Sequence, residues 1–388
     1  MHARCLALSL LVVASCHRSS STAPVVDEGL EPAQESVPAG EEAAIEEIRN
    51  ILVKYVRDKY QDHGPARRDA HVKAHGCLKA EVTIHANLDE RLAVGVFAEP
   101  KTYPAWIRFS NSNDTVQRDK KPDGRGMAIK LMGVPGKKIL PGYEDETTQD
   151  FVLINYPVFV VENAEEYVTF SSDTAKGHPL RFFFHGGKDR LAELDSAEHL
   201  ALQKIVSPLQ PTYYSMTPYL LGDGQAVKYG ATPCGSNDVT GKRCGPDFLE
   251  WNLVDGVVDQ PACFVLMVQR QTDPSRMPIE NPTVEWDPAL SPYLPVADVY
   301  IPPQRFDSDA QDQMCEQMSF NPWHTLPEHR PLGGINRVRR VVYKTISELR
   351  HQMNGIGIAE PRSHDVTEYL ERIGASLPEG SGHEAGNE

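Results

Sequence analysis

Hydrophobic residues recur with helical spacing in several parts of this chain, and those parts flank segments with strand character. Between residues 43 and 62, apolar side chains recur every three to four positions, which places them on one face of a helix. Residues 163–170, 191–205 and 335–353 are also predicted as helices. The last of these helices lies near the C-terminal end.

Strand-like segments are rich in β-branched and aromatic residues and are bounded by Gly, Pro or Asp. They occupy residues 77–86, 105–109, 127–132, 151–153, 260–271 and 296–301. Residues 307–334 are rich in Pro, His and Gly, which predicts an ordered wrap of loops. Strands followed by connecting segments and a C-terminal helix predict an α+β fold around an antiparallel β-barrel.

The composition agrees with one large folded unit. The chain has 388 residues, of which 40% are hydrophobic, so it can bury a sizeable core. Its formal net charge of −15 argues against nucleic acid or an anionic membrane surface as a partner, because both are polyanions. We expect the domain at residues 42–356 and a C-terminal tail at 357–388.

The N-terminus has the features of an export signal. Residues 1–15 combine a short positive start with an apolar run that is too short to span a bilayer. Small residues then precede Cys16, as in a bacterial lipobox, so a lipid on Cys16 would anchor an exported lipoprotein. A cleaved signal followed by a chance cysteine is the alternative. Residues 16–41 are rich in Ser, Pro, Glu and Ala, which predicts a disordered tether.

An exported protein can keep disulfides. Cys234 and Cys244 bracket a loop rich in Gly, Ser, Asn and Asp, which favours a disulfide between them, with two free thiols as the alternative. No Cys-x-x-Cys occurs, so a zinc site is not expected.

Arg339 and Tyr343 are the candidates for metal chemistry. They lie four residues apart in the C-terminal helix, so the guanidinium group can reach the phenol oxygen. A neighbouring cation favours the phenolate form, and phenolate is an oxygen ligand for ferric iron.

Four upstream segments resemble stretches of catalases. Residues 68–74 read Arg-Asp-Ala-His-Val-Lys-Ala, which is similar to the catalase stretch Arg-Val-Val-His-Ala-Lys-Gly. Residues 107–110 (Ile-Arg-Phe-Ser) resemble Val-Arg-Phe-Ser, and residues 123–130 (Asp-Gly-Arg-Gly-Met-Ala-Ile-Lys) resemble Asp-Pro-Arg-Gly-Phe-Ala-Val-Lys. Residues 150–159 (Asp-Phe-Val-Leu-Ile-Asn-Tyr-Pro-Val-Phe) are similar to Asp-Leu-Val-Gly-Asn-Asn-Thr-Pro-Ile-Phe. Because these segments occur in the same order and with similar spacing, the chain resembles a divergent member of the catalase-like haem superfamily.

This resemblance implies an eight-stranded barrel, a haem assumed to be of b type, and Tyr343 as the axial ligand of the iron. His71 would be the proton shuttle, with Ser110 orienting its ring. His75 is the competing histidine. Arg68 and Arg108 match positions that contact haem propionates.

Three further residues complete the expected site. Arg339 would be the partner of the axial tyrosine. Asn155 would supply the distal amide only if the turn is shifted by one residue, because alignment without gaps places Ile154 there. Tyr167 falls where catalases place a phenylalanine against the haem face, and a core aromatic residue is an equally good interpretation.

The resemblance therefore implies a haem-dependent catalase or peroxidase that removes peroxide outside the cytoplasm. A fatty-acid hydroperoxide isomerase or peroxidase on the same scaffold is one alternative, and a non-catalytic haem-binding lipoprotein is another. The expected partners are a peroxide substrate and, through the lipid anchor, a membrane. An oligomer is compatible with the sequence.

Overall fold

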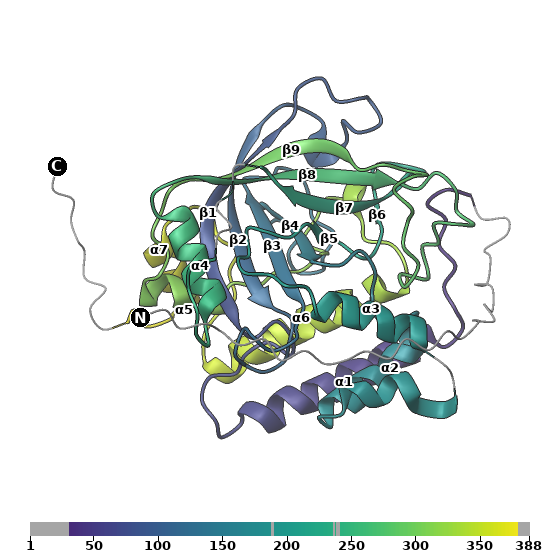
Figure 1. The fold of residues 1–388 in the computed structure, drawn as a ribbon, viewed down its shortest axis with the longest axis horizontal. Coiled ribbons are helices and arrows are strands. Elements are labelled where there is room, and N and C mark those ends of the chain that lie inside the picture. Colours follow the sequence, from purple (N-terminus) through teal and green to yellow (C-terminus); the bar gives the residue numbers. More distant parts are fainter. Residues whose placement is uncertain (1–30, 188–189, 236, 238–240, 379–388) are drawn as a thin grey trace, which may run out of the picture.

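The computed structural model describes residues 31–187, 190–235, 237 and 241–378. Within this part of the chain, nine strands form one antiparallel sheet that curls into a barrel (Figure 1). The strands are β1 (Ala74–Ile84), β2 (Thr102–Asn111), β3 (Arg125–Met132), β4 (Thr148–Ile154), β5 (Tyr213–Tyr214), β6 (Tyr219–Leu220), β7 (Ala226–Pro233), β8 (Ala262–Arg270) and β9 (Leu294–Ile301).

The short strand β5 closes the barrel. Tyr214 pairs with Ile154 of β4, and Tyr213 pairs with Ala231 of β7. The ring then runs β1-β2-β3-β4-β5-β7-β8-β9 and returns to β1, while β6 pairs only with β7 within the sheet. The predicted α+β fold with an antiparallel barrel is confirmed.

Aromatic and β-branched side chains fill the barrel. Phe109 of β2, Phe151 of β4 and Tyr229 of β7 are almost completely buried inside it. Alternate residues of a strand point to opposite faces, so Arg108 and Ser110, which flank Phe109, point away from this core. The outer face of β2 therefore carries the polar side chains expected in the site.

The helices surround the barrel. They are α1 (Glu41–Tyr60), α2 (Ala164–Ala175), α3 (Leu191–Ala201), α4 (Phe248–Val257), α5 (Asp309–Gln317), α6 (Gly334–Asn354) and α7 (Val366–Ile373), with 3-10 helices η1 (Gly95–Phe97), η2 (Pro179–Gly187) and η3 (Pro327–His329). Figure 1 shows α1, α2 and α6 layered below the barrel, and α4, α5 and α7 gathered beside β1. Among the described residues, no helix has the length and apolar character needed to cross a bilayer.

Apolar packing fixes the position of α6. Val338, Val342 and Ile346 lie on one face of α6 and pack with Ile48 and Val56 of α1 in a separate apolar cluster. Burial of each such side chain contributes roughly 1.5–3 kcal/mol. The helix that carries Arg339 and Tyr343 is therefore held between α1 and the barrel.

The predicted cysteine pairing is wrong. Cys234 bonds to Cys263 at the start of β8, and Cys244 is exposed and forms no disulfide with any other described cysteine. The backbone nitrogen of Cys234 also donates to the carbonyl oxygen of Cys263, so β-sheet neighbours are joined rather than the two ends of the loop. A second disulfide links Cys77 of β1 to Cys315 of α5.

Three segments contain helices or tertiary contacts that the sequence did not predict. Residues 307–334 contain α5 and η3, and α7 lies in the stretch expected to be a tail. Glu35, in the expected tether, forms ion pairs with Arg330 and with Arg337 of α6. The predicted signal and Cys16 lie outside the described residues.

Candidate functional site

A cavity of about 730 Å³ lies between the outer face of the barrel and the helices. Its walls come from β2, β3 and β4 on one side and from α2, η2, α3 and α6 on the other. His71, Ser110, Arg68, Arg108, Tyr167, Arg339 and Tyr343 all line it. Seven of the eight residues expected in the site are thus brought together from four separate parts of the chain.

His71 is held in an uncommon backbone conformation. Its φ of 56° lies in the left-handed region, which costs a non-glycine residue on the order of 1–3 kcal/mol. Its backbone nitrogen donates to the carbonyl oxygen of Ser112 at 3.0 Å, and Arg108 Nη2 donates to the His71 carbonyl oxygen at 2.8 Å. These bonds fix the direction in which the imidazole points.

The His71 ring lies 3.0 Å from Ser110, measured from Nδ1 to Oγ. Burial, and then the positive charges of Arg108 and Arg339, lower the pKa of His71 to about 3. The imidazole is therefore neutral at physiological pH and can accept a proton. The orienting contact expected of Ser110 is present.

Gly126 of β3 leaves room for this ring. A Cβ atom at position 126 would lie 2.7 Å from His71 Nδ1 and 2.8 Å from Ser110 Oγ. Any larger residue would push the imidazole out of its place. The glycine in the motif at residues 123–130 thus has a steric role in the site.

The opposite wall is α6, which carries the Arg339–Tyr343 pair. Arg339 Nη2 donates to Tyr343 Oη at 3.3 Å, and Nη1 donates to Thr217 Oγ1 and Asn336 Oδ1, both at 3.1 Å. Although burial alone would lower the pKa of Arg339, Tyr343 and Tyr219 raise it above its usual value. Arg339 is thus a fixed cation beside the phenol, as the helical spacing predicts.

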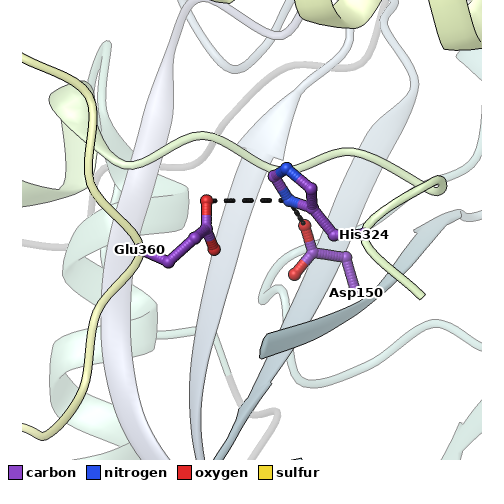
Figure 2. Close-up of side chains that lie close together, drawn as sticks. All are labelled: Asp150, His324 and Glu360. Carbon is purple, nitrogen blue, oxygen red and sulfur yellow. Dashed lines mark hydrogen bonds and ion pairs between the residues drawn. The ribbon is translucent and has the colours of Figure 1, made fainter. Parts of the chain in front are cut away.

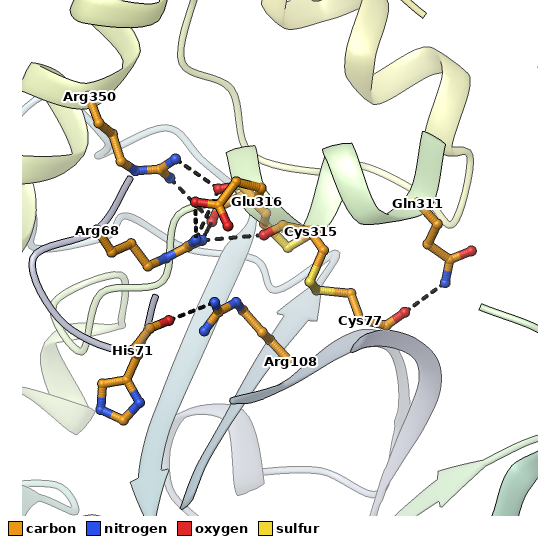
Figure 3. Close-up of a disulfide and its surroundings, with 9 residues drawn as sticks. Arg68, His71, Cys77, Arg108, Gln311, Cys315, Glu316 and Arg350 are labelled. Atoms are coloured by element: carbon orange, nitrogen blue, oxygen red, sulfur yellow. Dashed lines mark hydrogen bonds and ion pairs between the residues drawn. A yellow bond between two sulfur atoms is a disulfide. The ribbon is translucent and has the colours of Figure 1, made fainter. Parts of the chain in front are cut away.

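Three buried or half-buried arginines line the cavity. They are Arg68, Arg108 of β2 and Arg350 of α6 (Figure 3). Arg350 donates to the carbonyl oxygens of Glu316 and Gln317, each at 2.8 Å. Burial, followed by repulsion from Arg68, lowers the pKa of Arg350 to about 9 and that of Arg108 well below its usual range.

The Cys77–Cys315 disulfide connects this arginine cluster to the barrel. Arg68 donates to the Cys315 carbonyl oxygen at 3.3 Å and to that of Glu316 at 3.0 Å, and it forms a 3.2 Å ion pair with the Glu316 carboxylate (Figure 3). On the other side, Cys77 pairs directly with Arg108 in the register of β1 and β2. The disulfide therefore ties together the two segments that position the arginines.

Asn155 and His75 do not line the cavity. Asn155 Oδ1 accepts from the Arg125 backbone nitrogen at 2.6 Å, so its amide joins the ends of β3 and β4, and Ile154 lines the cavity instead. His75 Nε2 lies 2.8 Å from Asn111 Oδ1 in a buried polar network. Tyr167 lies in the wall with its ring 5.7 Å from that of Phe159, and burial raises its pKa.

A second buried cluster lies away from the cavity. His324 Nδ1 is 3.0 Å from Asp150 Oδ2 and 3.6 Å from Glu360 Oε1 (Figure 2). Lys130 forms ion pairs with both carboxylates, and Thr148 donates to Glu360 at 2.7 Å. Since a lysine ammonium already pairs with both carboxylates, the cluster is an ionic link between β3, β4 and two later segments.

Comparisons with known proteins support the fold. No protein-family model matches the sequence, and no curated protein matches it. Catalase A from Saccharomyces cerevisiae aligns with a TM-score of 0.60 and 15% identity, over 76% of this chain and 64% of the other. A fungal catalase aligns with a TM-score of 0.58 and 17% identity, over 76% of this chain and 61% of the other.

A bacterial catalase aligns over 94% of this chain and 71% of its own, with a TM-score of 0.58 and 15% identity. The chain spans less than two thirds of the length of the two fungal proteins. At such low identity the likeness concerns the fold. The protein therefore has a divergent catalase-like fold.

Proposed function

We propose that this protein binds haem and breaks down hydrogen peroxide or organic peroxides. The observation that supports the proposal best is that one cavity holds both a neutral, oriented histidine and a tyrosine beside a fixed arginine. The three similar solved structures are described as catalases. A base on one wall and an oxygen ligand for ferric iron on the other are what haem-dependent peroxide chemistry requires.

The lining of the cavity fits a haem. Its volume of about 730 Å³ is in the usual range for cofactor sites, and most of its lining residues are apolar. Haem propionates are carboxylates that pair well with guanidinium groups. Arg108 makes no ion pair among the described residues, and its buried Nε has no hydrogen-bond partner there. It is thus a cation available to a propionate, with Arg68 and Arg350 beside it.

In this proposal a haem, assumed to be of b type, would supply an iron that draws electrons through the peroxide O–O bond. Tyr343 would hold the iron, and Arg339 would place a positive charge beside its phenol oxygen. His71 would take the proton from one peroxide oxygen and return it to the other. In the complete reaction one hydrogen peroxide is reduced to water and a second is oxidised, so two molecules give two waters and one O₂.

One observation favours the isomerase or peroxidase alternative. The distal amide that the catalase resemblance implies is absent from the cavity lining, where Ile154 stands and Asn155 does not. A substituted distal amide is expected of a fatty-acid hydroperoxide isomerase or peroxidase on this scaffold. A non-catalytic haem-binding lipoprotein would share the cavity and yet turn over no peroxide.

Export is part of the proposal. Two disulfides support a compartment outside the reducing cytosol. Lipidation of Cys16 would then fix the protein to a membrane. The wild-type protein should sediment with membranes, and Cys16→Ser should release it or leave it unprocessed. Recovery of the wild-type protein entirely from the cytosol would refute export and lipidation together.

Oxygen release from hydrogen peroxide tests the catalytic proposal. The haem-loaded protein should evolve O₂ from hydrogen peroxide, measured with an oxygen electrode. Reduction of an organic hydroperoxide without O₂ release would favour peroxidase chemistry. Product analysis with a lipid hydroperoxide would identify an isomerase. If the protein consumes neither hydrogen peroxide nor the lipid hydroperoxide, only the haem-binding role would remain.

A further inference from the structure

The cavity reaches the surface between η2 and α3 through side chains that are both apolar and exposed. Leu180, Phe184 and Leu202 line the cavity and yet are 64%, 67% and 60% exposed, respectively. We call these three residues the mouth. Large apolar side chains exposed together mark binding surfaces, because leaving them in water is unfavourable.

The charge that lines the cavity beside the mouth has one sign. Among the described lining residues of η2, α3 and the position that follows α3, the only charged side chain is Glu198. Arg181 and Lys204 are exposed nearby but do not line the cavity. The lining arginines belong to other parts of the chain, namely the segment before β1, the strand β2 and the helix α6. A ligand that extends out of the cavity here would therefore meet apolar groups and one carboxylate.

We infer that the mouth admits a hydroperoxide carried on an uncharged alkyl or acyl-ester chain, and that it discriminates against free fatty-acid anions. This inference rests on the proposed function. A chain whose hydroperoxide group is inside the cavity leaves its other end near Glu198, where a carboxylate would be repelled and an ester would not. A second copy of the protein bound over the mouth would block the entrance that the proposed function requires. We therefore assign the mouth to the substrate.

The reaction balances with an external phenolic donor. The hydroperoxide ROOH takes two electrons and two protons from two phenols, which leaves ROH, one water and two phenoxyl radicals. The O–O bond breaks, and no other bond of the chain changes. A phenolic dye therefore reports turnover of any hydroperoxide offered.

The test compares two substrates that differ only in charge, the 13-hydroperoxide of linoleic acid and its methyl ester. The haem-loaded protein should favour the ester in kcat/KM by about tenfold. Glu198→Gln should reduce this preference several-fold. Leu180→Ser combined with Leu202→Ser should lower kcat/KM for the ester about tenfold, and by more than it lowers kcat/KM for hydrogen peroxide. Leu191→Ser is the matched control, because Leu191 is 57% exposed on α3 but does not line the cavity.

Equal use of acid and ester would overturn the inference, as would an equal effect of Leu191→Ser and of the mouth variant. So would a dimer that the mouth variant converts to a monomer in sedimentation. If the loaded protein turns over no peroxide at all, the proposed function fails. Equilibrium dialysis with unoxidised methyl linoleate then still tests the mouth, since the wild type should bind it more tightly than the mouth variant.

Discussion

Several contacts constrain both the backbone and the ring of His71. Its left-handed backbone is held by the Ser112 carbonyl oxygen and by Arg108, and its ring is held by Ser110 and by the space above Gly126. Strain that the surroundings maintain in this way is typical of functional positions. His75 has an ordinary role, because Asn111 binds its ring outside the cavity.

The two histidines should respond differently to replacement. His71→Ala should keep haem and lose roughly 10²–10⁴-fold in peroxide turnover, because proton transfer contributes that much. His75→Ala should mainly lower the free energy of unfolding, since it removes a partner from a buried polar network. Oxygen release and urea unfolding would be measured for both variants. The reverse ranking in turnover would move the site to His75.

Gly126→Ala tests the steric part of the site. The added methyl group would lie 2.7 Å from His71 Nδ1, so the ring has to move. We expect turnover to fall on the order of 10²-fold, because small misplacements of a catalytic group have effects of that size. Gly235→Ala is the control, as no atom lies within 4 Å of the Cβ that it would add. Equal turnover in the two variants would contradict the proposed packing.

The helix α6 organises the site through its periodicity. Arg339, Tyr343, Ile346 and Arg350 recur at intervals of three or four residues, and all of them line the cavity. The same spacing could have identified Arg350 from the sequence, because it lies seven positions after Tyr343 on the same face. Its contact with the end of α5 could not be predicted, since that depends on how α5 packs on β1.

The two disulfides should have different effects on haem. Cys77 and Cys315 lie 238 positions apart and join β1 to α5, while Cys234 and Cys263 lie 29 apart. Replacing Cys77 and Cys315 by Ser should lower the free energy of unfolding by roughly 3–5 kcal/mol. It should also weaken haem retention, because the carbonyl oxygens at the end of α5 hold Arg68 and Arg350.

The Cys234→Ser, Cys263→Ser pair is the control for this experiment. It should lower the free energy of unfolding by a smaller amount and leave haem retention unchanged, because neither cysteine belongs to the segments whose carbonyl oxygens hold Arg68 and Arg350. Haem loss to an acceptor protein and chemical unfolding would be followed in both double variants. Equal haem retention in the two would show that the first disulfide does not position the arginines.

Buried histidines predict sensitivity to acid. Burial lowers the pKa of His71 and of His329 to about 3, and that of His75 and of His351 to about 4. These values lie below the unfolded value of roughly 6.5. Below about pH 6.5 the unfolded chain binds more protons than the folded chain does. The stabilisation that the neutral, buried histidines provide is therefore complete above about pH 6.5 and is lost as the pH falls toward 3 to 4.

The free energy of unfolding should therefore decrease from pH 7.5 to pH 4.5 in urea titrations. His329→Gln should make this decrease smaller, because it removes one buried histidine that contacts Val96 and Tyr229. His329 is a suitable choice because it does not line the cavity. A constant free energy across this range would contradict the burial of these histidines.

The sequence predicts several regular elements of the fold and much of the candidate site, but not the strand β7 or the helices α4, α5 and α7. Long strands and the helices with helical apolar spacing are local patterns, and the motifs around His71, Ser110 and Tyr343 depend on short spacings. Three features depend on distant contacts instead. They are the Cys77–Cys315 bond, the closure of the barrel by the two-residue strand β5, and the displacement of Asn155 from the cavity.

Haem ligation by Tyr343 is tested most directly by the absorption spectrum of the purified protein. Wild-type protein loaded with haem should show a tyrosinate-ligated ferric spectrum, and Arg339→Ala should weaken that signature. Tyr343→Phe should lose haem or change the spectrum strongly, because it removes the phenol oxygen and little else. An unaltered haem content and spectrum in Tyr343→Phe would contradict the proposed site.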